Sequence, residues 1–180
     1  MYFNLMNLKR YIRSIKNFPK KGIVFRDITT LIENPKSFEY SINKMVEITS
    51  KRRFDKIVAI EARGFLFASI LANKKNKPLV LIRKKGKLPY KTVSKSFKLE
   101  YGSDTIEIHK SSIKKNEKVL LIDDLIATGG TVNAAIDLLH KVGAKVVLCG
   151  FVIDLPDLGG SKNLDLKKID NFSLVSYHGL

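Results

Sequence analysis

Short apolar runs, each bounded by polar residues, recur along this chain from residue 56 onward. Continuous runs of this length are typical of strands that are buried on both faces of a parallel sheet. The strands that they predict lie at residues 56–60, 79–83, 118–122, 145–153 and 172–177.

Between these runs, apolar residues recur at helical spacing. Asn34 followed by Pro35 is a typical helix start, and the apolar spacing continues that helix to Thr49. Further helices are expected at residues 65–72, from the turn at 127–131 to about 142, and near the N-terminus, where Leu5, Leu8, Ile12 and Ile15 would share one face.

Two segments lack a clear period. Residues 17–29 contain proline and glycine and are predicted to be irregular, although Ile23, Val24 and Phe25 are strongly apolar. Residues 84–101 show no apolar periodicity, and we expect a long mobile loop or a ribbon there. The alternation of buried strands with helices predicts an α/β fold with a mostly parallel sheet, in one domain that spans residues 1–180.

The composition is that of a globular protein, with 44% hydrophobic and 28% charged residues. No run approaches the ~18 apolar residues of a membrane span, so no membrane partner is expected. The N-terminal segment places its charges after its apolar residues, which is the reverse of a secretory signal. The single cysteine, Cys149, excludes an internal disulfide, and its apolar surroundings predict a buried, inert thiol. A reducing cytoplasm fits these features.

The net charge of +16 raises the possibility of nucleic-acid binding. However, the lysines are spread along the whole chain, and Lys, Asn and Ile are abundant together, which indicates a general compositional bias. We therefore do not expect nucleic acid to be a main partner. Residues 83–98 are the local exception, because lysine is dense there.

The segment VLLIDDLIATGGTV (119–132) combines two opposing features. Its glycines and the helix start at 127–131 would present free backbone N–H groups to an anion. Asp123 and Asp124, immediately before this turn, would repel the same anion. A phosphorylated ribose satisfies both, because its 5′-phosphate can occupy the turn while its 2′ and 3′ hydroxyls donate to the carboxylates. The alternative is a plain strand–turn–helix with Thr131 as N-cap and solvated aspartates.

Other phosphate and metal sites lack support. The chain contains neither a G-x-G-x-x-G nor a G-x-x-x-x-G-K-[ST] motif, and His109, His140 and His178 are isolated in the sequence.

The segment 119–132 resembles the phosphoribosyl-pyrophosphate (PRPP) motif of the type I phosphoribosyltransferases. Other segments resemble the adenine-using members of that family in the same order, namely GIVFRDIT (22–29), EARGFLF (61–67), IRKKGKLP (82–89), LEYG (99–102) and DLGG (157–160). Lys21 departs from the pattern, since the family often has proline before the glycine. The resemblance implies the type I fold, with a small hood formed by the N- and C-terminal segments and a flexible loop.

The resemblance also implies an activity, namely the conversion of adenine and PRPP to AMP and pyrophosphate. Mg²⁺ would be carried by PRPP, without a metal site of the protein's own, and the family is typically homodimeric. A rival interpretation is a non-catalytic regulator that senses PRPP and binds nucleic acid.

Individual roles follow from matching positions. The resemblance assigns the 5′-phosphate to Ala127, Thr128, Gly129, Gly130 and Thr131, the ribose hydroxyls and C1′ charge to Asp123 and Asp124, and the pyrophosphate to Arg63, Lys84 and Lys87. Arg63 could instead form an ion pair with Glu61 or with a surface aspartate. Glu100 would exchange a proton with the purine imidazole nitrogen, or else anchor the loop by a salt bridge.

The resemblance places the adenine pocket at VFRD (24–27). Phe25 would stack on the purine, and Val24 and Arg26 would present main-chain groups to its edge. Phe25 could alternatively be an ordinary core residue, because Ile23 and Val24 are apolar too.

Overall fold

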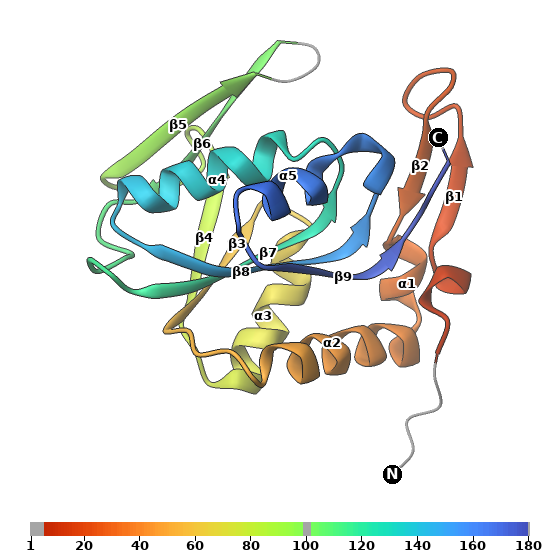
Figure 1. Ribbon diagram of the computed structural model, residues 1–180, viewed down its shortest axis with the longest axis horizontal. Helices are drawn as coiled ribbons and strands as arrows, with labels where there is room; N and C mark the ends of the chain where they lie inside the picture. The colour runs from red at the N-terminus through yellow and green to blue at the C-terminus, as the bar shows by residue number, and fades with distance from the viewer. Residues whose placement is uncertain (1–5, 99–101, 180) are drawn as a thin grey trace.

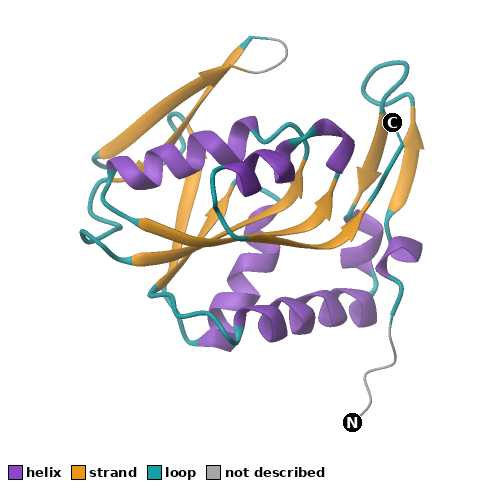
Figure 2. Cartoon of the chain, in the orientation of Figure 1, coloured by secondary structure: helices purple, strands orange, loops and turns teal. Residues whose placement is uncertain are grey.

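The protein is described by a computed structural model, which covers residues 6–98 and 102–179. A seven-stranded sheet carries helices on both faces, and a two-stranded ribbon stands beside it (Figures 1 and 2). The strands are β1 (Arg13–Lys16), β2 (Val24–Asp27), β3 (Lys56–Ile60), β4 (Leu79–Lys84), β5 (Thr92–Lys98), β6 (Ser103–His109), β7 (Lys118–Ile126), β8 (Lys145–Asp154) and β9 (Asn171–Ser176).

Helices cover the sheet from both sides. They are α1 (Thr29–Glu33), α2 (Pro35–Thr49), α3 (Gly64–Lys75), α4 (Gly130–Lys141) and α5 (Gly160–Leu166), with 3₁₀ turns at Leu8–Tyr11 and Pro156–Leu158. Helices α4 and α5 lie over one face, while α1, α2 and α3 pack against the other (Figure 1). None of the helices in the described ranges is long and apolar enough to cross a membrane.

The strand order in the large sheet is β5-β6-β4-β3-β7-β8-β9. Strands β4, β3, β7, β8 and β9 run parallel to one another, whereas β6 pairs antiparallel with β4 and β5 pairs antiparallel with β6. The prediction of an α/β fold with a mostly parallel sheet is confirmed. Two apolar cores result, one on each face, because the central strands send side chains to both sides.

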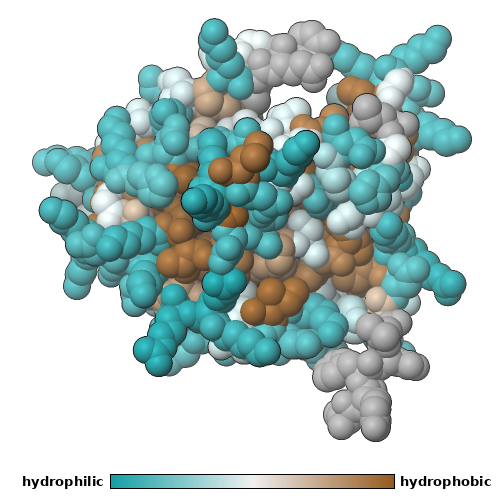
Figure 3. All heavy atoms as spheres, in the orientation of Figure 1, coloured by the Kyte–Doolittle hydropathy of each residue, from teal (hydrophilic) through white to brown (hydrophobic). Residues whose placement is uncertain are grey.

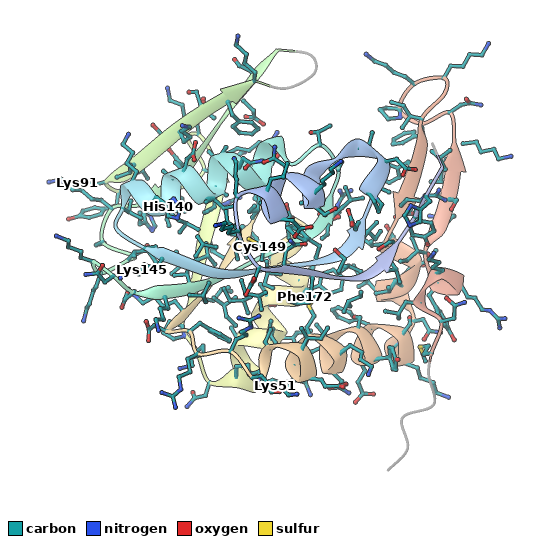
Figure 4. The ribbon with its side chains drawn as sticks, viewed as in Figure 1. Lys51, Lys91, His140, Lys145, Cys149 and Phe172 are labelled. Carbon is teal, nitrogen blue, oxygen red and sulfur yellow. The ribbon has the colours of Figure 1, made fainter. Side chains whose placement is uncertain are left out.

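Several local predictions are confirmed closely. Strand β3 has the predicted bounds, and α2 begins at Pro35 with the Asn34 side chain accepting a hydrogen bond from the Ser37 N–H at 3.1 Å. Cys149 lies in the interior, whereas Lys51, Lys91 and Lys145 lie at the periphery (Figure 4). Burial raises the pKa of the Cys149 thiol to about 12, which makes it unreactive near neutral pH.

The N-terminal segment differs from its prediction. In place of a helix, a 3₁₀ turn at Leu8–Tyr11 leads into β1, which pairs antiparallel with β2. Residues 17–29 are therefore not irregular throughout. Ile15 lies opposite Phe25 in this pairing, so a long-range partner, which helical spacing cannot reveal, decides the local structure.

The lysine-rich segment forms a ribbon where it is described. β5 pairs with β6 along its whole length, and β6 itself was not predicted. Exposed and half-buried positions alternate in β5, so the hairpin carries no continuous apolar run. Residues 99–101, which include Glu100, lie outside the described residues.

The predicted hood corresponds to the β1–β2 ribbon and the end of the chain. The guanidinium of Arg26 stacks on the ring of Tyr177, 4.1 Å from the ring centroid, and joins the two segments. Hydrophilic side chains project around the rim of the visible face, while hydrophobic side chains are exposed towards its middle (Figure 3).

Candidate active site

A cleft of about 460 Å³ opens where β3 and β7 end. Two chain segments line it: residues 61–63, which follow β3, and residues 123–132, which run from β7 into α4. The carboxyl ends of parallel strands are where ligands gather in open α/β sheets. The peptide bond between Glu61 and Ala62 at this edge is cis.

The turn from β7 to α4 provides a cradle for an anion. Gly129 is the N-cap of α4 and has a φ of 83°, a conformation that glycine adopts without strain. The first N–H groups of a helix have no partner within it, and α4 presents them to the cleft beside Thr128 and Gly130. Because Gly129 is the N-cap, the alternative with Thr131 in that position is wrong.

The paired acids lie inside β7 rather than after its end. The strand continues to Ile126, because Leu125 and Ile126 pair with β8. Asp123 is 8% exposed and Asp124 is 6% exposed, so the expectation of solvated aspartates in the alternative also fails. Gly64 permits this close packing, since a Cβ there would lie 3.0 Å from the Asp123 Cα.

The two carboxylates of the pair have different partners. Asp123 Oδ1 accepts a hydrogen bond from the Asp124 N–H at 2.8 Å, and Asp124 Oδ2 lies 2.7 Å from Arg63 Nε. Burial, together with the negative charge of Asp124, holds the pKa of Asp123 well above its usual range, although Arg63 opposes this. The charged form of Asp123 would therefore be stabilised by a ligand that donates a further hydrogen bond to it.

Arg63 forms an ion pair with Asp124, not with Glu61. Glu61 instead lies 3.2 Å from Arg83 Nε, and its Oε2 accepts from the Lys84 N–H at 2.7 Å. The Arg63 side chain is 49% exposed, which leaves the guanidinium accessible to a ligand in the cleft.

Lys84 and Lys87, the two lysines predicted to bind pyrophosphate, are exposed at the base of the β5–β6 ribbon. Lys84 Nζ pairs with Asp104 Oδ2 at 3.0 Å, while Lys87 is held through its carbonyl, which accepts from Arg83 Nη1 at 3.2 Å. Glu107, which sequence reasoning missed, shapes this turn. Its buried carboxylate accepts from the N–H groups of Gly86 (3.0 Å) and Leu88 (3.2 Å). The single acid within the apolar segment TIEIH was the available signal.

The predicted base-binding residues lie in β2. Phe25 is half-buried, and its ring packs edge-on against that of Phe18, with 5.2 Å between the ring centroids. The guanidinium carbon of Arg63 lies 5.6 Å from the centroid of the Phe25 ring. The contact with Arg63 brings β2 next to the cleft. Val24 and Arg26 flank Phe25 on the same strand, whose main chain pairs with β1.

Comparisons with known proteins identify the class of this site. The family model described as the phosphoribosyl transferase domain matches residues 28–175. The adenine phosphoribosyltransferase of Pelagibacter ubique is 55% identical over 174 residues, which cover 97% of this chain and 99% of the relative. The chain therefore belongs to the phosphoribosyltransferase family, in its adenine phosphoribosyltransferase branch.

Solved structures agree with this placement. The adenine phosphoribosyltransferase of Thermoanaerobacter pseudethanolicus superimposes with a TM-score of 0.90 at 44% identity, and covers 94% of this chain and 98% of its own. The Saccharomyces cerevisiae enzyme, crystallised with an imino-altritol bisphosphate and adenine, gives a TM-score of 0.86 at 35% identity. That match covers 93% of this chain and 96% of the yeast chain.

Proposed function

We propose that this protein is a purine-salvage enzyme that transfers the phosphoribosyl group of PRPP to adenine and releases AMP and pyrophosphate. The observation that supports it most directly is the position of two buried carboxylates beside a helix-start anion cradle in one cleft. Family membership and 55% identity to an adenine phosphoribosyltransferase support the same reaction.

The cradle and the acids would bind different parts of the sugar phosphate. The 5′-phosphate of PRPP would accept hydrogen bonds from the N–H groups of Ala127, Thr128, Gly129, Gly130 and Thr131. The 2′ and 3′ hydroxyls would donate to Asp123 and Asp124. These donors would add to the Asp124 N–H, from which the Asp123 carboxylate already accepts a hydrogen bond.

The same carboxylates support the chemical step. The bond from C1′ to the pyrophosphate oxygen breaks as the bond from C1′ to the adenine imidazole nitrogen forms, and positive charge develops on the ribose. Asp123 and Asp124 oppose that charge, which is greatest in the transition state. The imidazole proton of adenine would pass to Glu100.

The departing pyrophosphate would be held by cations. Arg63 is accessible in the cleft, and Lys84 and Lys87 lie at the base of the β5–β6 ribbon. A charge pair at 4 Å is worth about 1 kcal/mol in water and about 4 kcal/mol at an effective dielectric of 20. Closure of segment 84–101 over the reactants would therefore strengthen these contacts.

Mg²⁺ would enter with PRPP rather than occupy a site built by the protein. Phosphate oxygens are preferred ligands of this hard cation, and the cleft also contains the carboxylates of Glu61, Asp123 and Asp124. When bound, Mg²⁺ neutralises charge on the leaving pyrophosphate.

The remaining expectations concern the state of the protein. We propose one domain over residues 1–180 and a homodimer, for which a solution mass of two chains is the test. A cytoplasmic location fits the single, buried free cysteine.

The base is the part of the proposal that one experiment can settle. Adenine offers an acceptor at ring position 1 and a donor at position 6, while hypoxanthine and guanine offer the reverse pair. Main-chain groups of Val24 and Arg26, with Phe25 stacked on the purine, would read this pattern. A mismatch leaves buried groups unpaired and can cost ~10⁴-fold.

The experiment is to incubate the protein with PRPP, Mg²⁺ and each nucleobase in turn, and to measure the nucleotide that forms. We expect AMP from adenine, with kcat/KM for hypoxanthine and guanine lower by at least about a thousandfold. Comparable values for hypoxanthine would overturn the adenine assignment. Binding of PRPP without any nucleotide would instead indicate a non-catalytic regulator.

A further inference from the structure

The anion cradle is held from behind by residues that do not line the cleft. The carbonyl of Ala127 accepts a hydrogen bond from the Gly160 N–H at 2.9 Å, at the start of α5. The carbonyl of Gly129 accepts from the Asn133 side chain, Nδ2, at 2.7 Å, as well as from the Asn133 N–H at 2.9 Å. Helix α5 lies beside the start of α4, which Figure 1 shows.

These carbonyl contacts determine where the neighbouring N–H groups point. In a trans peptide, the carbonyl of one residue and the N–H of the next point in opposite directions. Cis peptides in the described residues occur only at Phe18–Pro19 and Glu61–Ala62, so both peptides of the turn are trans. The Ala127 carbonyl faces Gly160, so the Thr128 N–H points away from α5, and the Gly129 carbonyl faces Asn133, so the Gly130 N–H points away from the body of α4.

Gly160 is required for the close approach of α5. A Cβ at this position would overlap the Ala127 carbonyl oxygen and would lie 2.8 Å from the Gly129 nitrogen. Any side chain at residue 160 must push the turn forward into the cleft or push α5 away from it. In both cases the hydrogen bond from Gly160 to Ala127 is strained or lost.

Asn133 is itself held in place by Lys167. Lys167 Nζ lies 2.5 Å from Asn133 Oδ1, so the amide oxygen accepts from the lysine while the amide nitrogen donates to Gly129. This lysine follows α5 directly, and links the C-terminal end of that helix to the turn. Gly160 and Lys167 thus connect both ends of α5 to the cradle.

The geometry points to Asn133, Gly160 and Lys167 as positioning residues that preset the 5′-phosphate cradle. They act through the backbone of the turn and do not contact the substrate. This inference rests on the proposed function of the cleft, because it assumes that the cradle receives the 5′-phosphate of the sugar.

The test compares two ligands that use different parts of the site. Calorimetry would measure the binding of ribose 5-phosphate, which needs the cradle, and of Mg²⁺-pyrophosphate, which does not. We expect Asn133→Ala and Gly160→Ala each to weaken ribose 5-phosphate at least about tenfold, since one hydrogen bond to a charged phosphate has this value. Pyrophosphate affinity should change less than about twofold, and KM for PRPP should rise more than kcat falls.

Matched controls come from α5 itself. Lys162 and Asn163 are exposed residues of this helix, so Lys162→Ala and Asn163→Ala should bind ribose 5-phosphate like the wild type. Lys167→Ala should give a smaller loss than Asn133→Ala, because Asn133 keeps its donor. If Gly160→Ala does not fold, the asparagine and lysine variants still decide the question.

Two results would overturn the inference: wild-type ribose 5-phosphate affinity in Asn133→Ala, or equal loss of both ligands, which would indicate general damage. Neither result concerns the base, so a wild-type protein that forms AMP would leave the proposed function intact. Conversely, selective loss of ribose 5-phosphate in a protein that does not use adenine would uphold the cradle alone.

Discussion

Asp27 at the foot of the β1–β2 ribbon and Asp123 in the cleft are both 8% exposed, yet their surroundings differ completely. Asp27 accepts hydrogen bonds from Arg13 Nη2 at 2.5 Å and from the N–H of Thr29 at 2.9 Å, and also from the Thr29 hydroxyl. Asp123 accepts one from the Asp124 N–H and faces the carboxylate of that same residue.

The two acids titrate in opposite directions as a result. Hydrogen bonds from Thr29 and Arg13 lower the pKa of Asp27 to about 2, whereas burial and the charge of Asp124 raise the pKa of Asp123. Equal exposure to solvent therefore does not determine whether a carboxylate stabilises a fold, because the depth of burial and the hydrogen-bond partners of the two acids differ. A buried acid with a raised pKa and few hydrogen-bond donors is a candidate for a site where a ligand supplies more of them.

The largest effect should come from removing the charge of the cleft acids. Replacing both residues, as Asp123→Asn plus Asp124→Asn, keeps their shape but removes the charge that opposes the developing cation at C1′. We expect kcat to fall about 100-fold or more, which is the usual result of losing preorganised electrostatic stabilisation. Steady-state assays of AMP formation from adenine and PRPP measure it.

Glu117→Gln is the control for that experiment, because it removes a half-buried carboxylate, paired with Lys56 at 2.9 Å, at the end of β7 that lies opposite to the cleft. Its kcat should stay within about threefold of wild type at a temperature where the variant is folded. If the double variant turned over like the wild type, the proposed role of the cleft acids would be wrong.

The second effect is on stability. The change in the free energy of unfolding should have opposite signs for substitutions at Asp27 and at Asp123. At neutral pH, Asp27→Asn should lower the free energy of unfolding by about 1 to 2 kcal/mol, because the lowered pKa records favourable interactions of the charged form. Asp123→Asn should raise it by about 0.5 to 1 kcal/mol, as is common when a group kept for function is neutralised.

Urea unfolding of the ligand-free proteins measures both values. An unfolding free energy that falls in both variants by the same amount would mean that the partners of these acids do not matter. Saturating ribose 5-phosphate should reverse the advantage of Asp123→Asn, since the hydroxyls then supply donors to the wild-type carboxylate.

The parts of the structure that sequence reasoning predicted are those with a continuous local signal. Strand β3, helix α2 and the turn at Gly129 each carry their pattern within a few residues, and all three formed where expected. The paired acids were predicted to share a site with the turn, and one cleft contains both.

The parts that were missed depend on partners that are distant in the chain. Strand β1 exists because β2 lies beside it, and β7 extends past Asp124 because β8 offers pairing as far as Asp154. The hydrogen bond between Gly160 and Ala127 joins two residues that are 33 positions apart in the sequence. Spacing along one segment contains no information about such contacts, so only the folded chain reveals them.

The smallest effect is the pH dependence of the same two variants, and it tests the comparison most directly. The lowered pKa of Asp27 stabilises the protein above the unfolded value of 3.8, and this contribution is lost as pH falls towards about 2. The raised pKa of Asp123 has the opposite effect on stability: the folded state keeps the proton above pH 3.8, so stability is lost as pH rises towards the folded value.

The difference in unfolding free energy between wild type and Asp27→Asn should therefore grow by about 1 kcal/mol between about pH 3 and pH 5. Over the same interval, the difference between wild type and Asp123→Asn should move in the other direction. Two difference curves that both fall as pH rises would show that burial, and not the set of partners, controls both carboxylates.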